Sequence, residues 1–328
     1  MDKRERLERT IAGEPTDRSP VALWRHYPGD DLRAADFAQS IAEDQRTFDW
    51  DITSVMPGST YQVIDYGIHE QWHGTVAGER QITRHSVGRS LDWTELRSLD
   101  PTRGGHGRQI ECIRLVCQML EDTPVLLTVY SPLAQAEMLA GRELMLRHLR
   151  TQSDRLKSGL NVLAENLLRF IESLRKLPLA GICYVIRHAD FDVLAEDEYA
   201  SVGLPYDRQI FAAVPQRWWL NTVCLEGLAP MLRLVSGLPA QVMQWRDRDG
   251  EPDIAVGKSL CTGAVCGGLS SERDLYQGTP TSVRDTARES LQRVNQRRLI
   301  LSTGSPMMMA TPRSNIRAMR AVVEPASV

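Results

Sequence analysis

A thiol and a carboxylate stand two residues apart in the second half of the chain, at Cys224 and Glu226. An apolar run leads into them, Gly227 ends it, and a helical pattern follows, which predicts a buried strand that opens into a loop. Successive strand residues point to opposite faces, so both side chains would project the same way. Such a pair could serve group transfer by activating a thiol or by holding a metal. The simpler alternative is a cysteine that fills the core and a glutamate that caps the next helix.

Other polar residues also stand where apolar runs begin or end. An arginine there offers a planar fork of donors for a carboxylate or phosphate, and a histidine can carry a proton or simply bond a backbone carbonyl. An aspartate could act as an acid or base, or cap a strand. Residues 246–249 fit a solvated turn. The candidates for substrate binding are Arg25, His26, Tyr130, Arg187, Trp245 and Ser305, and those for catalysis are Asp51 and His188 together with Cys224 and Glu226.

These candidates need secondary-structure elements that bring them together. Eight short apolar runs alternate with helical patterns, which predicts a parallel sheet of the α/β class, and eight such strands predict a single (β/α)8 TIM barrel. Chemistry in such barrels sits at the carboxyl ends of the strands, so the candidates would share one mouth. The predicted strands cover residues 20–24, 51–56, 124–130, 181–186, 221–227, 241–245, 259–265 and 299–303.

Two segments between these runs are longer than the others. Residues 59–105 contain aromatics, three histidines and scattered glycines, which favour hairpins over helix. We expect this stretch to be an insertion after the second strand that forms a lid or pocket wall, within one domain spanning residues 1–328. The helical pattern of residues 133–174 predicts two helices that break near Ser158 and Gly159.

The composition excludes several classes of protein. The chain has 328 residues, is 42% hydrophobic and carries a formal net charge of -3, so it has room for a large core and no broad basic field for nucleic acid. Its six cysteines contain no C-x-x-C pair, which favours a reducing cytoplasm. No apolar run approaches the roughly 18 residues that cross a bilayer, and no apolar signal core follows the charged start. We therefore expect a cytoplasmic protein that binds neither nucleic acid nor membrane.

Short motifs, in order along nearly the whole chain, resemble one family. They are residues 3–6 (KRER), 13–18 (GEPTDR), 203–207 (GLPYD), 263–269 (GAVCGGL), 278–280 (GTP), 300–304 (ILSTG) and 311–316 (TPRSNI). In these motifs the chain is similar to proteins of the uroporphyrinogen decarboxylase superfamily. The resemblance implies a TIM barrel, a homodimer, and activity either as a porphyrinogen decarboxylase or as a zinc methyltransferase that moves methyl groups between corrinoids and thiols.

The methyltransferases of this superfamily carry a His-x-Cys-Gly segment after the fifth strand and a Cys after the eighth. Aligned on the glycines at 227 and 304, Cys224 and Glu226 take the first two positions and Ser305 takes the third. The resemblance thus implies zinc or another divalent metal with Cys224 and Glu226 as ligands. Ser305 is a poor zinc ligand, so a third ligand would have to come from another residue.

The decarboxylases carry two arginines four residues apart that grip substrate carboxylates. Arg25 matches the first of them, whereas Gly29 stands at the second position. Asp51 approximates the aspartate that holds the pyrrole NH groups, and Ser305 replaces a histidine. A macrocycle with four carboxylates is therefore not favoured by this resemblance.

The predicted function is methyl or one-carbon group transfer on a small anionic or thiol substrate, with a corrinoid or a thiol as methyl donor or acceptor. The alternative is decarboxylation of a porphyrinogen-like carboxylate, with Arg25 gripping the carboxylate while Asp51 stabilises positive charge. A third alternative is a non-catalytic binding protein that has lost the metal site of its relatives.

Overall fold

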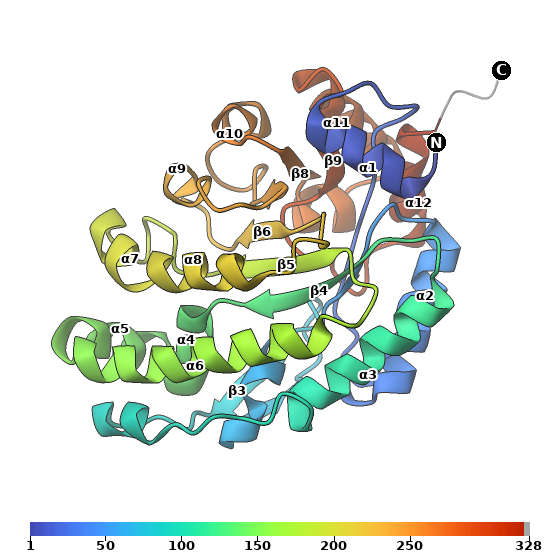
Figure 1. Cartoon of the computed structure of the whole chain (residues 1–328). Helices are drawn as coiled ribbons and strands as arrows, with labels where there is room; N and C mark the ends of the chain where they lie inside the picture. Colours follow the sequence, from blue (N-terminus) through green and yellow to red (C-terminus); the bar gives the residue numbers. More distant parts are fainter. Residues whose placement is uncertain (325–328) are drawn as a thin grey trace.

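A curved parallel sheet forms the centre of the computed structural model, which describes residues 1–324 (Figure 1). Seven strands pair in the order β1-β4-β5-β6-β7-β8-β9, so each strand after β1 lies beside the one that precedes it in this sheet. Parallel neighbours that follow one another through helices are typical of α/β proteins. The strands are β1 (Thr53–Val55), β4 (Val125–Tyr130), β5 (Gly181–Ile186), β6 (Thr222–Leu225), β7 (Val242–Gln244), β8 (Ala264–Leu269) and β9 (Leu299–Thr303).

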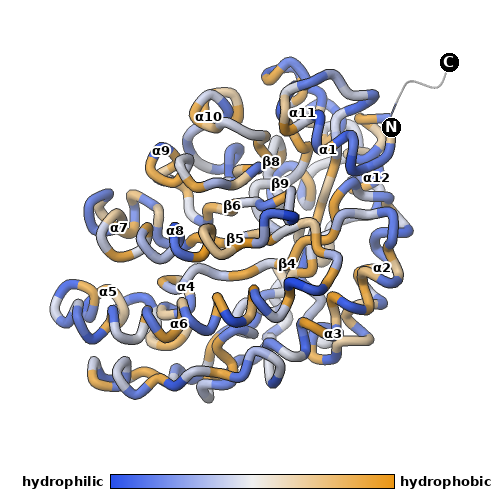
Figure 2. The backbone as a smooth tube through the Cα atoms, viewed as in Figure 1, coloured by the Kyte–Doolittle hydropathy of each residue, from blue (hydrophilic) through white to orange (hydrophobic). Residues whose placement is uncertain are grey.

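The helices cover the outer face of this sheet, and Figure 2 shows apolar and polar residues alternating along α3 and α6, as one-sided burial requires. Ser131 and Thr279 cap α4 and α11, each directly before a proline in the first turn. The helices are α1 (Lys3–Ala12), α2 (Ala34–Phe48), α3 (Gly104–Met119), α4 (Pro132–Ala140), α5 (Arg142–Thr151), α6 (Ser153–Leu174), α7 (Glu196–Val202), α8 (Leu204–Ala213), α9 (Leu232–Val235), α10 (Ile254–Leu260), α11 (Pro280–Arg293) and α12 (Arg313–Val322).

Apolar side chains fill both sides of the sheet. Between sheet and helices lies a large core, whereas a smaller cluster fills the inside of the curve with Leu126, Val242 and Ile300. Leu7 of α1 belongs to this inner cluster and is fully buried. Helix α1 therefore packs against the inner cluster at the amino-terminal ends of the strands, where Arg6 also bonds Asp51.

The segment 20–24 was predicted as a full strand but forms only a parallel bridge between Val21 and Leu301 of β9. Two hydrogen bonds accompany the bridge, from Ala22 N to Leu301 O (3.1 Å) and from Leu301 N to Pro20 O (2.9 Å). On its other side, Val21 O accepts from Asp51 N (2.9 Å), two residues before β1. Pro20 has no N–H to extend the ladder toward its amino end.

The strand predicted at 259–265 is wrong. Helix α10 runs to Leu260, and β8 begins at Ala264, so Gly267 and Gly268 lie inside the strand instead of after it. A side chain at Gly267 would meet Asp247 Oδ1 at 2.3 Å, which explains why only glycine fits the close approach there.

The two helices predicted over 133–174 are three, namely α4, α5 and α6. The first break falls at Gly141, whose φ of 79° suits glycine, and the second falls at Gln152. Gly159 lies inside α6, where its missing side chain makes room for Trp93.

Residues 59–105 contain no long helix before α3. An antiparallel pair, β2 (His69–Gln71) and β3 (Gln81–Arg84), is flanked by three 3-10 helices, η2 (Ser59–Gln62), η3 (Ile64–Tyr66) and η4 (Ser90–Glu95). Among residues 1–324, no helix combines the length and apolar character needed to span a membrane.

Candidate active-site pocket

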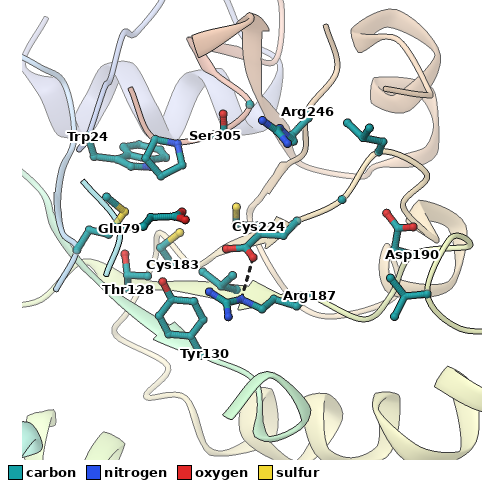
Figure 3. A pocket seen from close by; sticks show the side chains of 18 of the residues that line it. Trp24, Glu79, Thr128, Tyr130, Cys183, Arg187, Asp190, Cys224, Arg246 and Ser305 are labelled. Atoms are coloured by element: carbon teal, nitrogen blue, oxygen red, sulfur yellow. Dashed lines mark ion pairs between the residues drawn. The ribbon is translucent and has the colours of Figure 1, made fainter. Parts of the chain in front are cut away.

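A cavity of about 380 Å³ opens at the carboxyl ends of the strands (Figure 3). Parallel α/β sheets place binding sites at this edge because all the strands direct their exits there. Six of the ten residues predicted from the sequence line it: His26, Tyr130, Arg187, Cys224, Glu226 and Ser305. The structure thus brings together side chains from 20–26, β4, β5, β6 and the exit of β9.

An ion pair lies within the pocket, between Arg187 after β5 and Glu226 after β6. Arg187 Nε lies 2.8 Å from Glu226 Oε2, and the guanidinium also lies over the Tyr130 ring, 5.0 Å from its centre. The Arg187 side chain is 18% exposed and that of Glu226 is 44% exposed. Burial disfavours the charge of Arg187, but Glu226 and Tyr130 raise its pKa above the ordinary value. Arg187 is therefore a permanent cation, held in place by its neighbours.

Two thiols also line the pocket, Cys183 of β5 and Cys224 of β6. A hydrogen bond with Cys183, followed by burial and the nearby charge of Glu226, raises the pKa of Cys224 well above its ordinary value. Cys224 is consequently a neutral thiol at physiological pH. It is not an activated nucleophile in this environment.

The residues predicted to hold a metal do not form a three-ligand site. Glu226 is engaged by Arg187, and Ser305 Oγ shares a 2.7 Å hydrogen bond with Ser271 Oγ. Within the part of the chain that the structure describes, no group of three or more His, Cys, Asp or Glu side chains is arranged to hold a metal ion. The zinc site implied for Cys224 and Glu226 thus lacks the third protein ligand that catalytic zinc requires.

His26 contributes a neutral imidazole to the pocket wall. Burial lowers its pKa to about 4, with Arg80 and Arg187 adding to the effect while Asp31 and Glu226 oppose it. At neutral pH the ring can therefore donate one hydrogen bond and accept another.

Four predicted residues lie outside the pocket lining, and two of them are buried beneath or beside it. His188 is fully buried, and its Nε2 lies 2.6 Å from Glu137 Oε2. Burial alone would raise the pKa of Glu137, but the contact with His188 and the charge of Arg142 lower it to about 2. Trp245 is also fully buried and donates from Nε1 to Pro252 O (2.7 Å).

Asp51 and Arg25 lie farther from the cavity. Asp51 stands at the amino-terminal end of its strand, where it is fully buried and accepts hydrogen bonds from Arg6, Arg18 and the backbone of Val21. Arg25 pairs with Asp44 of α2 at 3.2 Å. Successive residues of an extended segment face opposite sides, so the presence of both Trp24 and His26 in the pocket turns Arg25, which lies between them, outward. The positions shared with decarboxylases therefore do not converge on the pocket.

The structure adds lining residues that the sequence did not single out. Cys183 shares a face of β5 with Arg187, so strand alternation could have identified it. Arg142 starts α5, and Glu79 comes from the loop between β2 and β3. No periodic pattern in that loop marks Glu79, because its place in the pocket depends on how the loop packs against distant parts of the chain.

Comparisons with known proteins bear on the family and the fold of this chain. The model of the family described as uroporphyrinogen decarboxylase (URO-D) matches residues 78–325. No curated protein matches the chain. Among solved structures, a methyltransferase from Methanosarcina mazei superposes with a TM-score of 0.85, 17% identity and 98% coverage of both chains. A B12-independent methionine synthase from Shewanella, in complex with selenomethionine, has a TM-score of 0.58, 14% identity and coverage of 94% of this chain and 92% of its own.

At these identities the two structures show a common fold. The family model covers most of the chain and includes the motifs from 203 to 316 that suggested the resemblance, which is thereby confirmed. This chain belongs to the uroporphyrinogen decarboxylase family.

Proposed function

We propose that the chain is an enzyme that transfers a methyl or other one-carbon group to or from a small anionic or thiol substrate in this pocket. The observation that carries the proposal is Arg187, a cation that lies over Tyr130, pairs with the partly exposed Glu226 and lines a cavity of about 380 Å³. Arg142 and Arg246 line the same cavity. Ligand pockets span about 300–1,000 Å³, so this one suits a small molecule better than a tetrapyrrole.

In the proposed reaction the methyl group leaves its donor without the bonding electron pair and forms a new S–C bond with an acceptor thiol. The proton of that thiol must leave at the same time, and the carboxylate of Glu226 is a pocket group that can take it. Arg187 would hold the anionic part of the substrate, and the neutral His26 would orient it through a hydrogen bond. The donor or acceptor partner would be a corrinoid or a second thiol, and a homodimer in the cytoplasm would fit the family resemblance.

We further propose that residues 1–324 form a single (β/α)8 barrel, while residues 325–328 of the predicted domain lie outside the described residues. Segment 20–24 would occupy the eighth position, supported by its hydrogen bonds to Leu301 on one side and Asp51 on the other. Residues 59–105 would be an insertion that supplies one pocket wall, as the position of Glu79 in the lining supports.

Decarboxylation is the second candidate because the same arginines could hold a substrate carboxylate next to the one that leaves. The two reactions differ in their products. Incubation of the purified full chain with methylcobalamin and a panel of small thiols should change the corrinoid spectrum if methyl transfer occurs. Release of CO2 from uroporphyrinogen or small carboxylates would favour decarboxylation instead.

Arg187→Met tests the anion site in either case. We expect the variant to bind propionate at least about tenfold more weakly in a calorimetric titration, since a charge-assisted hydrogen bond is lost. Arg284→Met is the control, because it removes one positive charge from the surface of α11, at a site outside the pocket. Equal affinities in the two variants would contradict the proposed anion site. Metal analysis of the purified protein would show independently whether any ion is retained.

A further inference from the structure

We infer that Glu79 is a specificity-determining residue, and that the substrate carries a cationic nitrogen facing Glu79 in addition to an anionic group facing Arg187. The inference rests on the proposed function, because it assigns the second half of the ligand that the same pocket would take. The substrate class is then a small zwitterion. It is not a simple carboxylate or thiol.

Glu79 differs from the other carboxylates that line the pocket. Glu226 is paired with Arg187, and Asp190 accepts from the backbone N–H groups of Asp192 (2.8 Å) and Ala229 (3.0 Å). The Glu79 side chain forms no hydrogen bond or ion pair with any of residues 1–324, yet Figure 3 shows it reaching into the pocket toward Cys224. Asp192 is likewise exposed and its side chain has no partner among residues 1–324, but the charge of Glu79 raises the pKa of both Arg187 and Tyr130.

The loop that carries Glu79 is firmly attached. Arg80 donates to Asp31 from Nη1 (2.7 Å), and both side chains are almost fully buried. Gly78, at a φ of 80°, packs so closely on His26 and Met309 that a side chain would meet them at 2.9 and 2.7 Å. Thr75 Oγ1 donates to the backbone oxygen of Glu79 (3.0 Å). The backbone of Glu79 is therefore held at one wall of the pocket, which keeps its free carboxylate within reach of a ligand.

The pocket therefore presents opposite charges to its contents. A purely anionic ligand would meet Arg187 on one wall but repulsion from Glu79 on another. A ligand with a protonated or quaternary nitrogen satisfies both walls, and the repulsion then excludes its anionic competitors.

The test compares matched probes on the full chain by calorimetric titration. The probes are glycine, β-alanine and γ-aminobutyrate, the carboxylates acetate, propionate and butyrate, and the amines methylamine, ethylamine and propylamine. We expect at least one amino acid to bind about tenfold or more tightly than its matched carboxylate and amine. In Glu79→Gln that preference should disappear, with carboxylate affinity unchanged or higher. Glu95→Gln removes a charge from an exposed site of the same region and should retain the preference.

The outcomes separate this inference from the proposed function. If carboxylates bind in an Arg187-dependent manner but the amino group adds no affinity, or if Glu79→Gln keeps the preference, the role of Glu79 is wrong while the anion site stands. If no probe binds, or if the affinities are the same in Arg187→Met as in the wild type, the proposed anion site is wrong. The proposed zwitterionic substrate is then wrong as well. Unchanged circular dichroism and unfolding midpoints in Glu79→Gln would show that the variant is folded.

Discussion

Glu226 already occupies the guanidinium that an anionic substrate would need. The carboxylate is 44% exposed, so it can exchange its partner at modest cost. Glu226→Gln removes this internal competitor, and we expect the affinity for propionate to rise by up to about tenfold. Calorimetric titration of the variant beside Glu95→Gln would measure the change. Weaker binding in Glu226→Gln would instead mean that Glu226 positions Arg187 more than it competes with the ligand.

His106 should make the protein sensitive to mild acid. The centres of the His106 and Phe170 rings lie 4.4 Å apart. Burial lowers the pKa of His106 to about 4, although the charge of Asp65 acts in the opposite direction. In the unfolded chain the group titrates near 6.5, so unfolding takes up a proton as the pH falls. His106 thus contributes stability that is complete above about pH 6.5 and is lost toward pH 4.

The free energy of unfolding should fall over that window, by up to about 3 kcal/mol for this one group. His106→Gln should show a smaller fall between pH 7 and pH 4.5 in urea titrations. The exposed His73→Gln serves as the control. An identical pH dependence in the wild type and His106→Gln would contradict the effect of burial.

At the scale of elements, the β2–β3 loop depends on Arg80, which pairs with the buried Asp31 and also lies 3.6 Å from Glu70 Oε1. Asp31 accepts from Arg80 and from the backbone of Gly29 (3.2 Å) and Gly58 (3.0 Å), so removing Arg80 leaves a buried carboxylate without its counter-charge. Breaking a buried pair typically costs 3–5 kcal/mol. We expect Arg80→Ala to lower the free energy of unfolding by about 3 kcal/mol in urea titrations. The double variant Asp31→Asn/Arg80→Met should recover part of this loss, and a loss equal to the sum of both single variants would argue against the pair.

Strand-exit reasoning predicted much of the pocket because it depends on local order. Arg187, Glu226 and Ser305 follow strands whose carboxyl ends meet at one edge, and Cys224 is the last residue but one of β6. The same reasoning placed Arg25 wrongly, because it ignored the alternation that turns His26 inward.

Glu79 could not be predicted from local order at all. Its position depends on a loop whose anchors, Asp31 and Met309, lie far away in the sequence. The boundary between α10 and β8 was also predicted wrongly, since three small residues at 266–268 weaken the strand pattern in the second half of β8.

For the whole molecule, Asp51 links parts that local patterns treat separately. It accepts from Arg6 of α1 (2.7 Å), from Arg18 (2.7 Å) and from Val21 N (2.8 Å), and it is fully buried. Asp51→Asn would remove the counter-charge of the largely buried Arg18 and leave the buried Arg6 paired with Asp17 alone. We expect the free energy of unfolding to fall by about 3 kcal/mol in urea titrations, while the folded variant retains its affinity for propionate. If Asp51→Asn lost its affinity for propionate while its free energy of unfolding stayed unchanged, Asp51 would have a role in the active site.

The sequence predicted the parallel α/β architecture at this scale because buried runs and helical runs alternate so regularly. It overestimated the length of segment 20–24, whose pairing depends on distant residues and not on its own composition.

The bridge between Val21 and Leu301 has a consequence for how the protein is made. During synthesis, Val21 emerges long before its partner, so the ladder on that side stays unformed until nearly all of β9 has left the ribosome. Until then segment 20–24 and β8 are both open edges, available for pairing with other nascent chains. Contacts so distant in sequence also slow refolding, so the vulnerable moment in the life of this protein is the interval before its first and last strands meet.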